Sequence, residues 1–483
     1  MFLRMKTLVS FVVLGCLAAH SIAQAADAEL RAKAAQALRR ACEYFDTHVS
    51  TEGGYLWQYS EDLRVRAGEG MAPATAVWVQ PPGTPSVGMA FLRAYHATKD
   101  PYYLGLAKKA GECLRRGQLQ SGGWHYRIDF DPATRRKFAF RVDENSATGG
   151  RFNISTLDDN TTQAALRFLI LLDQTLQFKD AAIHEVVEYG LQKLLEAQYP
   201  NGAWPQRFSA PPDPSRFPTK KASYPATWSR TFPAASYYGY YTFNDNAMAD
   251  TIALMFLAAR VYSQPKYRAS AEKGGDFILL AQMPDPQPAW AQQYDADMHP
   301  AWARKFEPPS ITGGESQGVI KMLLQLYTET GNRKYIEPVP RALEYLKKSA
   351  LADGRLARFY ELQTNRPLYF TRDYQLTYDD SDLPTHYAFK VPNHLATLET
   401  GYQRLLKMDG AQLKARQREC EWKSSPPKWR VVQEVIARLD DQGRWLEKTP
   451  ASQKDKRAFP SGNILSCATF IRNTTVLANY LAP

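Results

Sequence analysis

Residues 194–208 read LLEAQYPNGAWPQRF, which is the end of an amphipathic helix followed by a turn at Gly202-Ala-Trp204. Similar turns recur along the chain, and most follow a helix that ends in Leu and Gln. Gly54 and Gly123 are 69 residues apart, and Gly123 and Gly202 are 79 apart, so each unit has room for a helical hairpin and a functional loop. The turns are Gly53-Gly-Tyr55, Gly122-Gly-Trp124, Gly202-Ala-Trp204, Pro288-Ala-Trp290 and Gly354-Arg-Leu356.

The helices between these turns fall into two kinds. In residues 166–172 (LRFLILL) and 252–258 (IALMFLA) apolar side chains surround almost the whole helix, as expected of inner helices buried on several sides. Their partners are more amphipathic. We therefore expect an all-α fold, an (α/α) toroid of helical hairpins with few short strands and long active-site loops on one face. The proline-rich segment 208–240 and the segment 355–390 are the longest of these loops.

The N-terminus carries Arg4 and Lys6, an apolar run over 8–19 and the small-residue site Ala23-Gln-Ala25. This pattern predicts a signal peptide over residues 1–25, and so a protein that is secreted or periplasmic. A lipoprotein signal ending at Cys16 is an alternative. No later segment has the roughly 20 apolar residues of a membrane span. We expect residues 26–483 to form one catalytic domain and the protein to be a monomer.

Removal of residues 1–25 lowers the formal charge from +11 to +9, since two positive and no negative side chains are lost. The chain has no compact basic tract, so we expect no nucleic-acid partner, and an acidic polysaccharide agrees better with export. Four cysteines remain, and none lies in a CxxC pair. Two disulfides and buried free thiols are both open for Cys42, Cys113, Cys420 and Cys467.

Two acidic segments precede inner helices. They are Thr156-Leu-Asp-Asp-Asn-Thr-Thr162, with Asp158, and Asn244-Asp-Asn246, with Asp245. Each can be explained as a helix N-cap without a ligand. On neighbouring hairpins of a toroid, however, both would meet at one mouth and offer hard carboxylate oxygens to a calcium ion.

Arginines beside aromatic residues mark two further segments, residues 300–310 with Arg304 and residues 357–373 with Arg358 and Arg372. Loop arginines are commonly solvated or ion-paired. In such surroundings they also serve to hold carboxylates through two parallel hydrogen bonds. A site of this kind favours an acidic substrate.

Six segments in order resemble polysaccharide lyase family 10, the pectate lyases with an (α/α) toroid. The resemblance extends over about residues 85–390. The segments are the T-x-D-x-x-x-T pattern at 156–162, Asn201-Gly-Ala-Trp-Pro-Gln206, Thr242-Phe-Asn-Asp-Asn-Ala-Met248, Trp290-Ala-Gln-Gln-Tyr294, Ala303-Arg-Lys-Phe-Glu-Pro-Pro-Ser310 and Ala357-Arg-Phe-Tyr-Glu361.

The resemblance implies calcium-dependent β-elimination on polygalacturonate. It places calcium at Asp158 and Asp245, makes Arg304 the catalytic residue, and assigns substrate binding to Arg358, Arg372, Trp204 and Gln206. The chain departs from the family at Ala203, where a second glycine is usual, and in the length of 208–240. These departures bear on the shape of the subsites.

An arginine that acts as the base must lose a proton, although a guanidinium has a pKa above about 12. Alkaline pH and a nearby cation would favour that loss. Two other functions remain open, a non-catalytic oligogalacturonate-binding protein and a toroid enzyme like the terpene cyclases. Asp158-Asp159 resembles part of the acidic motifs of the cyclases, but this chain contains neither a complete DDxxD motif nor a complete DxDD motif.

Overall fold

The structure is a computed structural model that describes residues 26–143, 149–417, 421–449 and 462–482. The expected signal peptide at 1–25 and Cys420 lie outside this part of the chain. Cys42, Cys113 and Cys467 are buried free thiols. Within the four described ranges, no helix is both long and apolar enough to cross a bilayer.

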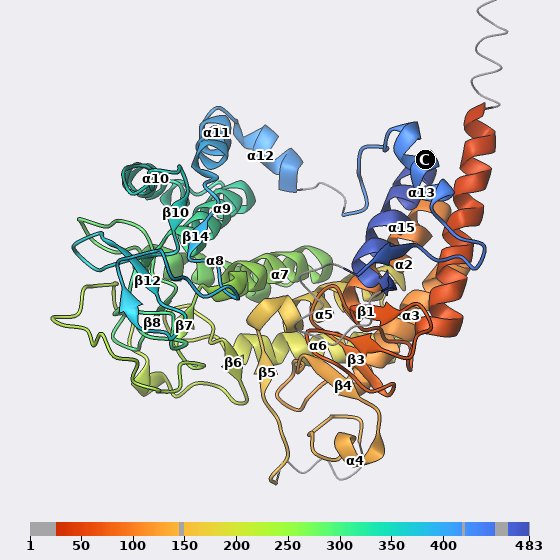
Figure 1. The fold of residues 1–483 in the computed structure, drawn as a ribbon, viewed down its shortest axis with the longest axis horizontal. Coiled ribbons are helices and arrows are strands. Elements are labelled where there is room, and N and C mark those ends of the chain that lie inside the picture. The colour runs from red at the N-terminus through yellow and green to blue at the C-terminus, as the bar shows by residue number, and fades with distance from the viewer. Residues whose placement is uncertain (1–25, 144–148, 418–420, 450–461, 483) are drawn as a thin grey trace, which may run out of the picture.

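The architecture is a succession of helical hairpins, which confirms the (α/α) toroid (Figure 1). The inner helices pack against one another in the order α15, α2, α5, α7, α9 and α11. Four complete hairpins are α2 (Thr84–Thr98) with α3 (Pro101–Arg116), α5 (Thr161–Thr175) with α6 (Ala181–Glu196), α7 (Ala247–Tyr262) with α8 (Pro265–Leu280), and α9 (Gly313–Thr330) with α10 (Val339–Lys348). The remaining α-helices are α4 (Pro132–Arg135), α11 (Leu395–Leu406), α12 (Gly410–Gln417), α13 (Trp429–Ala437), α15 (Cys467–Leu481) and residues 26–44.

Short antiparallel strand pairs bring the start of each inner helix to the end of its outer partner. The pairs are β3 (Ala76–Trp78) with β4 (Arg127–Asp129), β5 (Ser155–Thr156) with β6 (Arg207–Phe208), β7 (Tyr241–Thr242) with β8 (Gln293–Tyr294), and β9 (Ile311–Thr312) with β11 (Phe359–Tyr360). Because every pair precedes an inner helix, the N-termini of these helices share one face of the toroid.

Further strands extend this face. The strands β10 (Leu356–Ala357) and β14 (Lys390–Val391) pair before α11, and β12 (Pro367–Phe370) and β13 (Leu376–Thr377) extend the β9–β11 sheet. The last sheet contains β1 (Gln58–Ser60), β2 (Arg66–Ala67), β15 (Leu446–Lys448) and β16 (Asn463–Ser466).

The two ends of the described chain form one further hairpin. Helix 26–44 lies beside α15 (Figure 1), where the Arg31 guanidinium donates to the carbonyls of Tyr480 and Leu481 at 2.9 and 2.7 Å. Phe45 stacks on Phe470 with ring centroids 3.6 Å apart. Since β1 also pairs with β16, residues far apart in sequence complete the same repeat unit as the internal hairpins.

Three of the turns are held by a glutamine side chain at the end of an outer helix. The Gln198 amide donates to the carbonyls of Gly202 at 2.9 Å and Ser270 at 3.0 Å, which joins the turn to the next outer helix. Gln118 and Gln282 make equivalent bonds across their turns. A Cβ on Gly202, whose φ is +98°, would lie 2.0 Å from the Lys273 carbonyl oxygen, so this close approach requires glycine.

A sixth turn, at Gly443-Arg-Trp445, was missed in the sequence. Gly443 has a φ of +88°, and the Trp445 indole N–H donates to the Val435 carbonyl at 2.8 Å. The Trp124 and Trp204 indoles make the same bond to a carbonyl ten residues earlier. The C-terminal helix begins at Cys467, directly after β16.

The proline-rich segment 208–240 is held by hydrogen bonds to neighbouring parts of the chain. Its backbone donates from Ala222 to the Leu280 carbonyl at 2.8 Å and from Ser223 to the Met298 carbonyl at 3.2 Å. Farther along, the Trp302 indole donates to the Ser229 carbonyl at 2.8 Å. These contacts fix the segment against the loops that follow α8.

The glutamine bonds give the first prediction. Replacing the buried Gln118 with Leu leaves the Gly122 and Val186 carbonyls without their side-chain donor, which should lower the free energy of unfolding by about 1–3 kcal/mol. The exposed Gln192→Leu on α6 is the control and should change it by less than about 0.5 kcal/mol. Urea unfolding followed by circular dichroism measures both, and equal midpoints would contradict the role of Gln118.

Candidate functional site

Two acidic turns with the same backbone conformation begin the inner helices α5 and α7. They are η2 (Asp158–Asn160) and η4 (Asn244–Asn246), and they contact each other. Asp159 has φ 49° and ψ 34°, and Asp245 has φ 48° and ψ 34°. Asp159 is therefore the structural equivalent of Asp245. Sequence reasoning missed Asp159, although aligning Leu-Asp-Asp-Asn with Phe-Asn-Asp-Asn reveals it.

The explanation of these residues as N-caps is wrong. The cap positions are occupied by Asn160 and Asn246, and neither side chain makes a capping hydrogen bond. Instead, one Asp158 oxygen accepts from the Tyr126 hydroxyl at 2.7 Å, and one Asp245 oxygen accepts from the Asn244 amide at 2.5 Å. The carboxylates are therefore available for another purpose.

Asp158, Asp159 and Asp245 form one acidic cluster, with a carboxylate oxygen from each within 4.8 Å of the others. Loss of hydration, reinforced by the charge of Asp158, raises the pKa of Asp159 to about 6. Asp245 keeps an exposed edge, but the surrounding chain removes much of its water, and this effect with the charges of Asp159 and Asp158 raises its pKa to about 7. Without a cation the cluster is electrostatically unfavourable.

The donors of this cluster suit a hard divalent cation. The Asp158 Oδ1 and Asn244 Oδ1 atoms are buried, and neither has a hydrogen-bond partner among the described residues. Buried polar atoms without partners are uncommon in folded proteins. Carboxylate and amide oxygens are also the ligands that calcium prefers. The residues present therefore fit a calcium ion.

Arg304 lies in the loop after β8 and is held by Glu307. Its Nη2 is 2.5 Å from Glu307 Oε1, and the Tyr387 hydroxyl donates to that same oxygen at 2.8 Å. Burial alone would lower the pKa of Arg304, but the hydrogen bond and charge of Glu307 outweigh it, and the net pKa is raised. The Arg304–Glu307 pair favours the protonated form of the guanidinium, whereas a base must be deprotonated.

Arg358 also lies close to Tyr387. The Arg358 and Arg304 guanidiniums are 4.6 and 5.4 Å from the Tyr387 ring centroid, and Arg358 also donates to Glu315 at 3.0 Å. The Asp245 carboxylate contributes to the raised pKa of both arginines. The structure thus brings together Asp158, Asp245, Arg304 and Arg358. Three carboxylates and two guanidiniums can bind a cation and an anionic ligand together.

Arg372 is placed differently. It forms an ion pair with Asp382, with Nε and Oδ1 3.1 Å apart, and the side chains of both residues are more than half exposed. The contacts found for Arg372 in the described ranges do not reach the acidic cluster, so its contact with substrate stays a prediction.

The expected substrate contact of Trp204 is corrected by the structure. Its side chain is 1% exposed, and its indole N–H donates to the Leu194 carbonyl at 2.9 Å, so Trp204 supports the turn. Gln206 is also buried, and its carbonyl accepts from the Leu157 N–H at 2.8 Å, directly beside Asp158. Its side-chain Oε1 has no partner among the described residues. Substrate binding by Gln206 stays a prediction.

Arg207 is a further residue beside the acidic cluster that the sequence analysis did not identify. It pairs in register with Thr156, two residues before Asp158. Its guanidinium lies 4.0 Å from the Tyr238 ring centroid, and its Nε is buried without a hydrogen-bond partner in the described chain. Arg207 directly follows Gln206 of the Trp-Pro-Gln segment, and this position in the sequence could have indicated that it lies near the site.

Parts of the chain are similar to known polysaccharide-degrading enzymes. Residues 118–355 match the family model of pectic acid lyase, whereas no curated protein matches the chain. A family 10 polysaccharide lyase from Cellvibrio cellulosa is similar to 67% of this chain and 97% of its own, with 22% identity and a TM-score of 0.45. A mutant of that lyase in complex with trigalacturonic acid gives the same coverage and TM-score at 21% identity.

An α-mannanase of glycoside hydrolase family 76 from Bacteroides thetaiotaomicron is also similar, over 94% of both chains, with 8% identity and a TM-score of 0.41. The family match includes the acidic cluster and Arg304, and it supports polysaccharide lyase activity. The resemblance found in the sequence is thereby confirmed by the match of residues 118–355 to the family model of pectic acid lyase.

Proposed function

We propose that the protein is a pectate lyase, which cleaves polygalacturonate by calcium-assisted β-elimination and releases unsaturated oligogalacturonates. The observation that carries this proposal is the acidic cluster beside Arg304 and Arg358, within or directly next to the segment that matches pectic acid lyases. The basic net charge favours approach of a polyanion. Residues 1–25 support export to the periplasm or beyond.

Asp158, Asp159 and Asp245 would hold the calcium ion. When bound, calcium supplies positive charge that neutralises the uronate carboxylate and stabilises the charge that develops beside it. Arg358 lies next to the cluster and has unused donors for a carboxylate, since a guanidinium carries five N–H groups. The family resemblance assigns Arg372 and Gln206 to substrate binding as well.

In β-elimination, the carbon next to the carboxylate loses a proton, the glycosidic oxygen leaves from the neighbouring carbon, and a double bond forms between these carbons. We assign Arg304 as the base that removes this proton from carbon. Glu307 and Tyr387 orient the guanidinium, but Glu307 also keeps it protonated in the free protein. To act as a base, the Arg304 guanidinium must therefore lose one of its own protons before turnover, and alkaline pH favours that loss.

The second prediction tests the reaction itself. Purified protein should depolymerise polygalacturonate with calcium present, because the cluster and arginines together neutralise the uronate carboxylate. The ultraviolet absorbance of the unsaturated product should rise with time and stop when a chelator is added. Saturated products would indicate a hydrolase, and a rate unchanged by chelation would contradict the calcium assignment.

The third prediction concerns pH. In the metal-free protein the pKa values of Asp159 and Asp245, about 6 and about 7, lie above the ordinary value of 3.8. The folded state then holds extra protons, so its stability falls as pH rises from about 4 through 7. Calcium binds the deprotonated carboxylates and reverses this loss. Calcium should therefore raise Tm more at pH 8 than at pH 5.

Differential scanning calorimetry measures this calcium effect. Asp245→Asn should reduce the calcium-dependent rise at pH 8, while the exposed Asp441→Asn serves as the matched control and should keep it. Equal calcium shifts at pH 5 and pH 8 in the unmodified protein would show that calcium does not bind at these carboxylates.

The fourth prediction concerns Arg304. Arg304→Lys keeps the charge but loses the planar geometry and the hydrogen bond to Glu307, so kcat should fall more than about tenfold, a barrier change above about 1.4 kcal/mol. Binding of trigalacturonate should be retained. Lys305→Gln is the neighbouring control and should keep kcat. If Arg304→Lys retains more than a tenth of kcat and Lys305→Gln does not, Lys305 replaces Arg304 as the base.

A further inference from the structure

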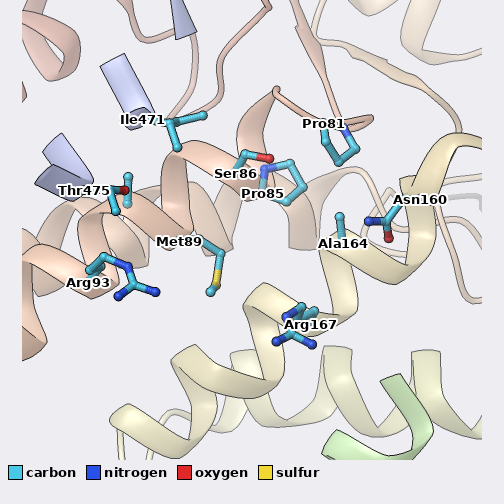
Figure 2. A pocket seen from close by; sticks show the side chains of 11 residues that line it. Pro81, Pro85, Ser86, Met89, Arg93, Asn160, Ala164, Arg167, Ile471 and Thr475 are labelled. Atoms are coloured by element: carbon cyan, nitrogen blue, oxygen red, sulfur yellow. The ribbon is translucent and has the colours of Figure 1, made fainter. Parts of the chain in front are cut away.

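A pocket of about 370 Å³ lies between α2, α5 and α15, next to the first acidic turn (Figure 2). Its wall combines three kinds of side chain. Met89 and Ile471 are apolar, Asn160 and Thr475 are uncharged and polar, and Arg93 and Arg167 are basic. The residues that line the pocket include these two arginines and no carboxylate. Its volume lies in the ordinary range of small-molecule sites.

Hydrogen bonds hold the Arg93 and Arg167 guanidiniums in place, but they do not use all of the N–H donors. Arg93 donates to Asn479 Oδ1 at 3.2 Å and to the Glu421 carbonyl at 3.5 Å, and Arg167 donates to Glu421 Oε1 at 2.5 Å. Each guanidinium has five N–H donors, so both keep donors for a ligand. Figure 2 shows both side chains at the pocket, Arg93 from α2 and Arg167 from α5.

The pocket is continuous with the proposed catalytic face. Asn160 follows Asp159 directly and lines the pocket, and Arg167 lies seven residues farther along the same chain. At a rise of about 1.5 Å per residue, Arg167 is about 10 Å farther into the toroid. The α2 and α15 walls lie outside residues 118–355, so the terminal hairpins add this pocket to the segment that matches the family.

We propose that this pocket is a subsite for one uronate residue of the substrate chain, with its carboxylate held by Arg93 and Arg167. The planar guanidinium matches a carboxylate through parallel hydrogen bonds. The apolar wall at Met89 and Ile471 packs on the C–H face of a sugar ring, and Asn160 and Thr475 bind its hydroxyls. The proposal rests on the proposed function for the identity of the polymer.

Calorimetric titration with trigalacturonate tests the subsite, on the full chain with calcium present. Arg93→Gln and Arg167→Gln should each weaken binding at least about tenfold, since each removes a charged hydrogen-bond donor. Binding of fully methyl-esterified trigalacturonate should be the same in both variants and the unmodified protein. Arg260→Gln on α7, whose arginine is ion-paired with Glu329 at 3.0 Å, is the matched control and should bind trigalacturonate normally.

A further variant tests the pocket without changing either arginine. Ala164 lines the pocket, so Ala164→Phe should fill it and weaken binding of both the acid and the ester. The subsite is overturned if all three pocket variants bind trigalacturonate as the unmodified protein does, or if the unmodified protein does not bind it. If binding depends on the arginines but no unsaturated product forms, the subsite stands and the proposed lyase reaction fails.

Discussion

The bond between a glutamine side chain and the turn that follows its helix is the constraint on which the rest of this structure depends. Gln118, Gln198 and Gln282 each join their own turn to the next outer helix, so the hairpins keep one relative orientation. Short strands then begin each inner helix on the same face. Two acidic turns separated by more than eighty residues meet on this face.

Much of this arrangement could be predicted from sequence, because turns and helices are local. The five turns, the apolar inner helices and the pairing of acidic segments all follow from short-range patterns. The hairpin formed by helix 26–44 and α15 could not be predicted, since Arg31 and Tyr480 meet only through tertiary packing. Trp204 was assigned wrongly because Gly-x-Trp does not reveal whether an indole faces a ligand or a carbonyl.

The acidic cluster required backbone angles that sequence does not supply. Asp158 and Asp159 are adjacent, and the left-handed conformation that Asp159 shares with Asp245 shows that these two residues are structurally equivalent. Such conformations are unfavourable for residues other than glycine and often occur at functional sites. Here the backbone strain and the repulsion among three carboxylates are concentrated in the same turns. A cation would relieve the repulsion, which links the local structure to the proposed function.

The Arg304–Glu307 pair shows a conflict between orientation and reactivity. Glu307 is 2% exposed, and with Tyr387 it fixes the guanidinium that we assign to the proton. The same carboxylate stabilises the charged form of Arg304 and opposes its use as a base. The Arg358 guanidinium lies at the same Tyr387 ring, 4.6 Å from its centroid. Burial lowers the pKa of Arg304, but Glu307 raises it further, so the contact that orients the guanidinium also opposes the loss of its proton.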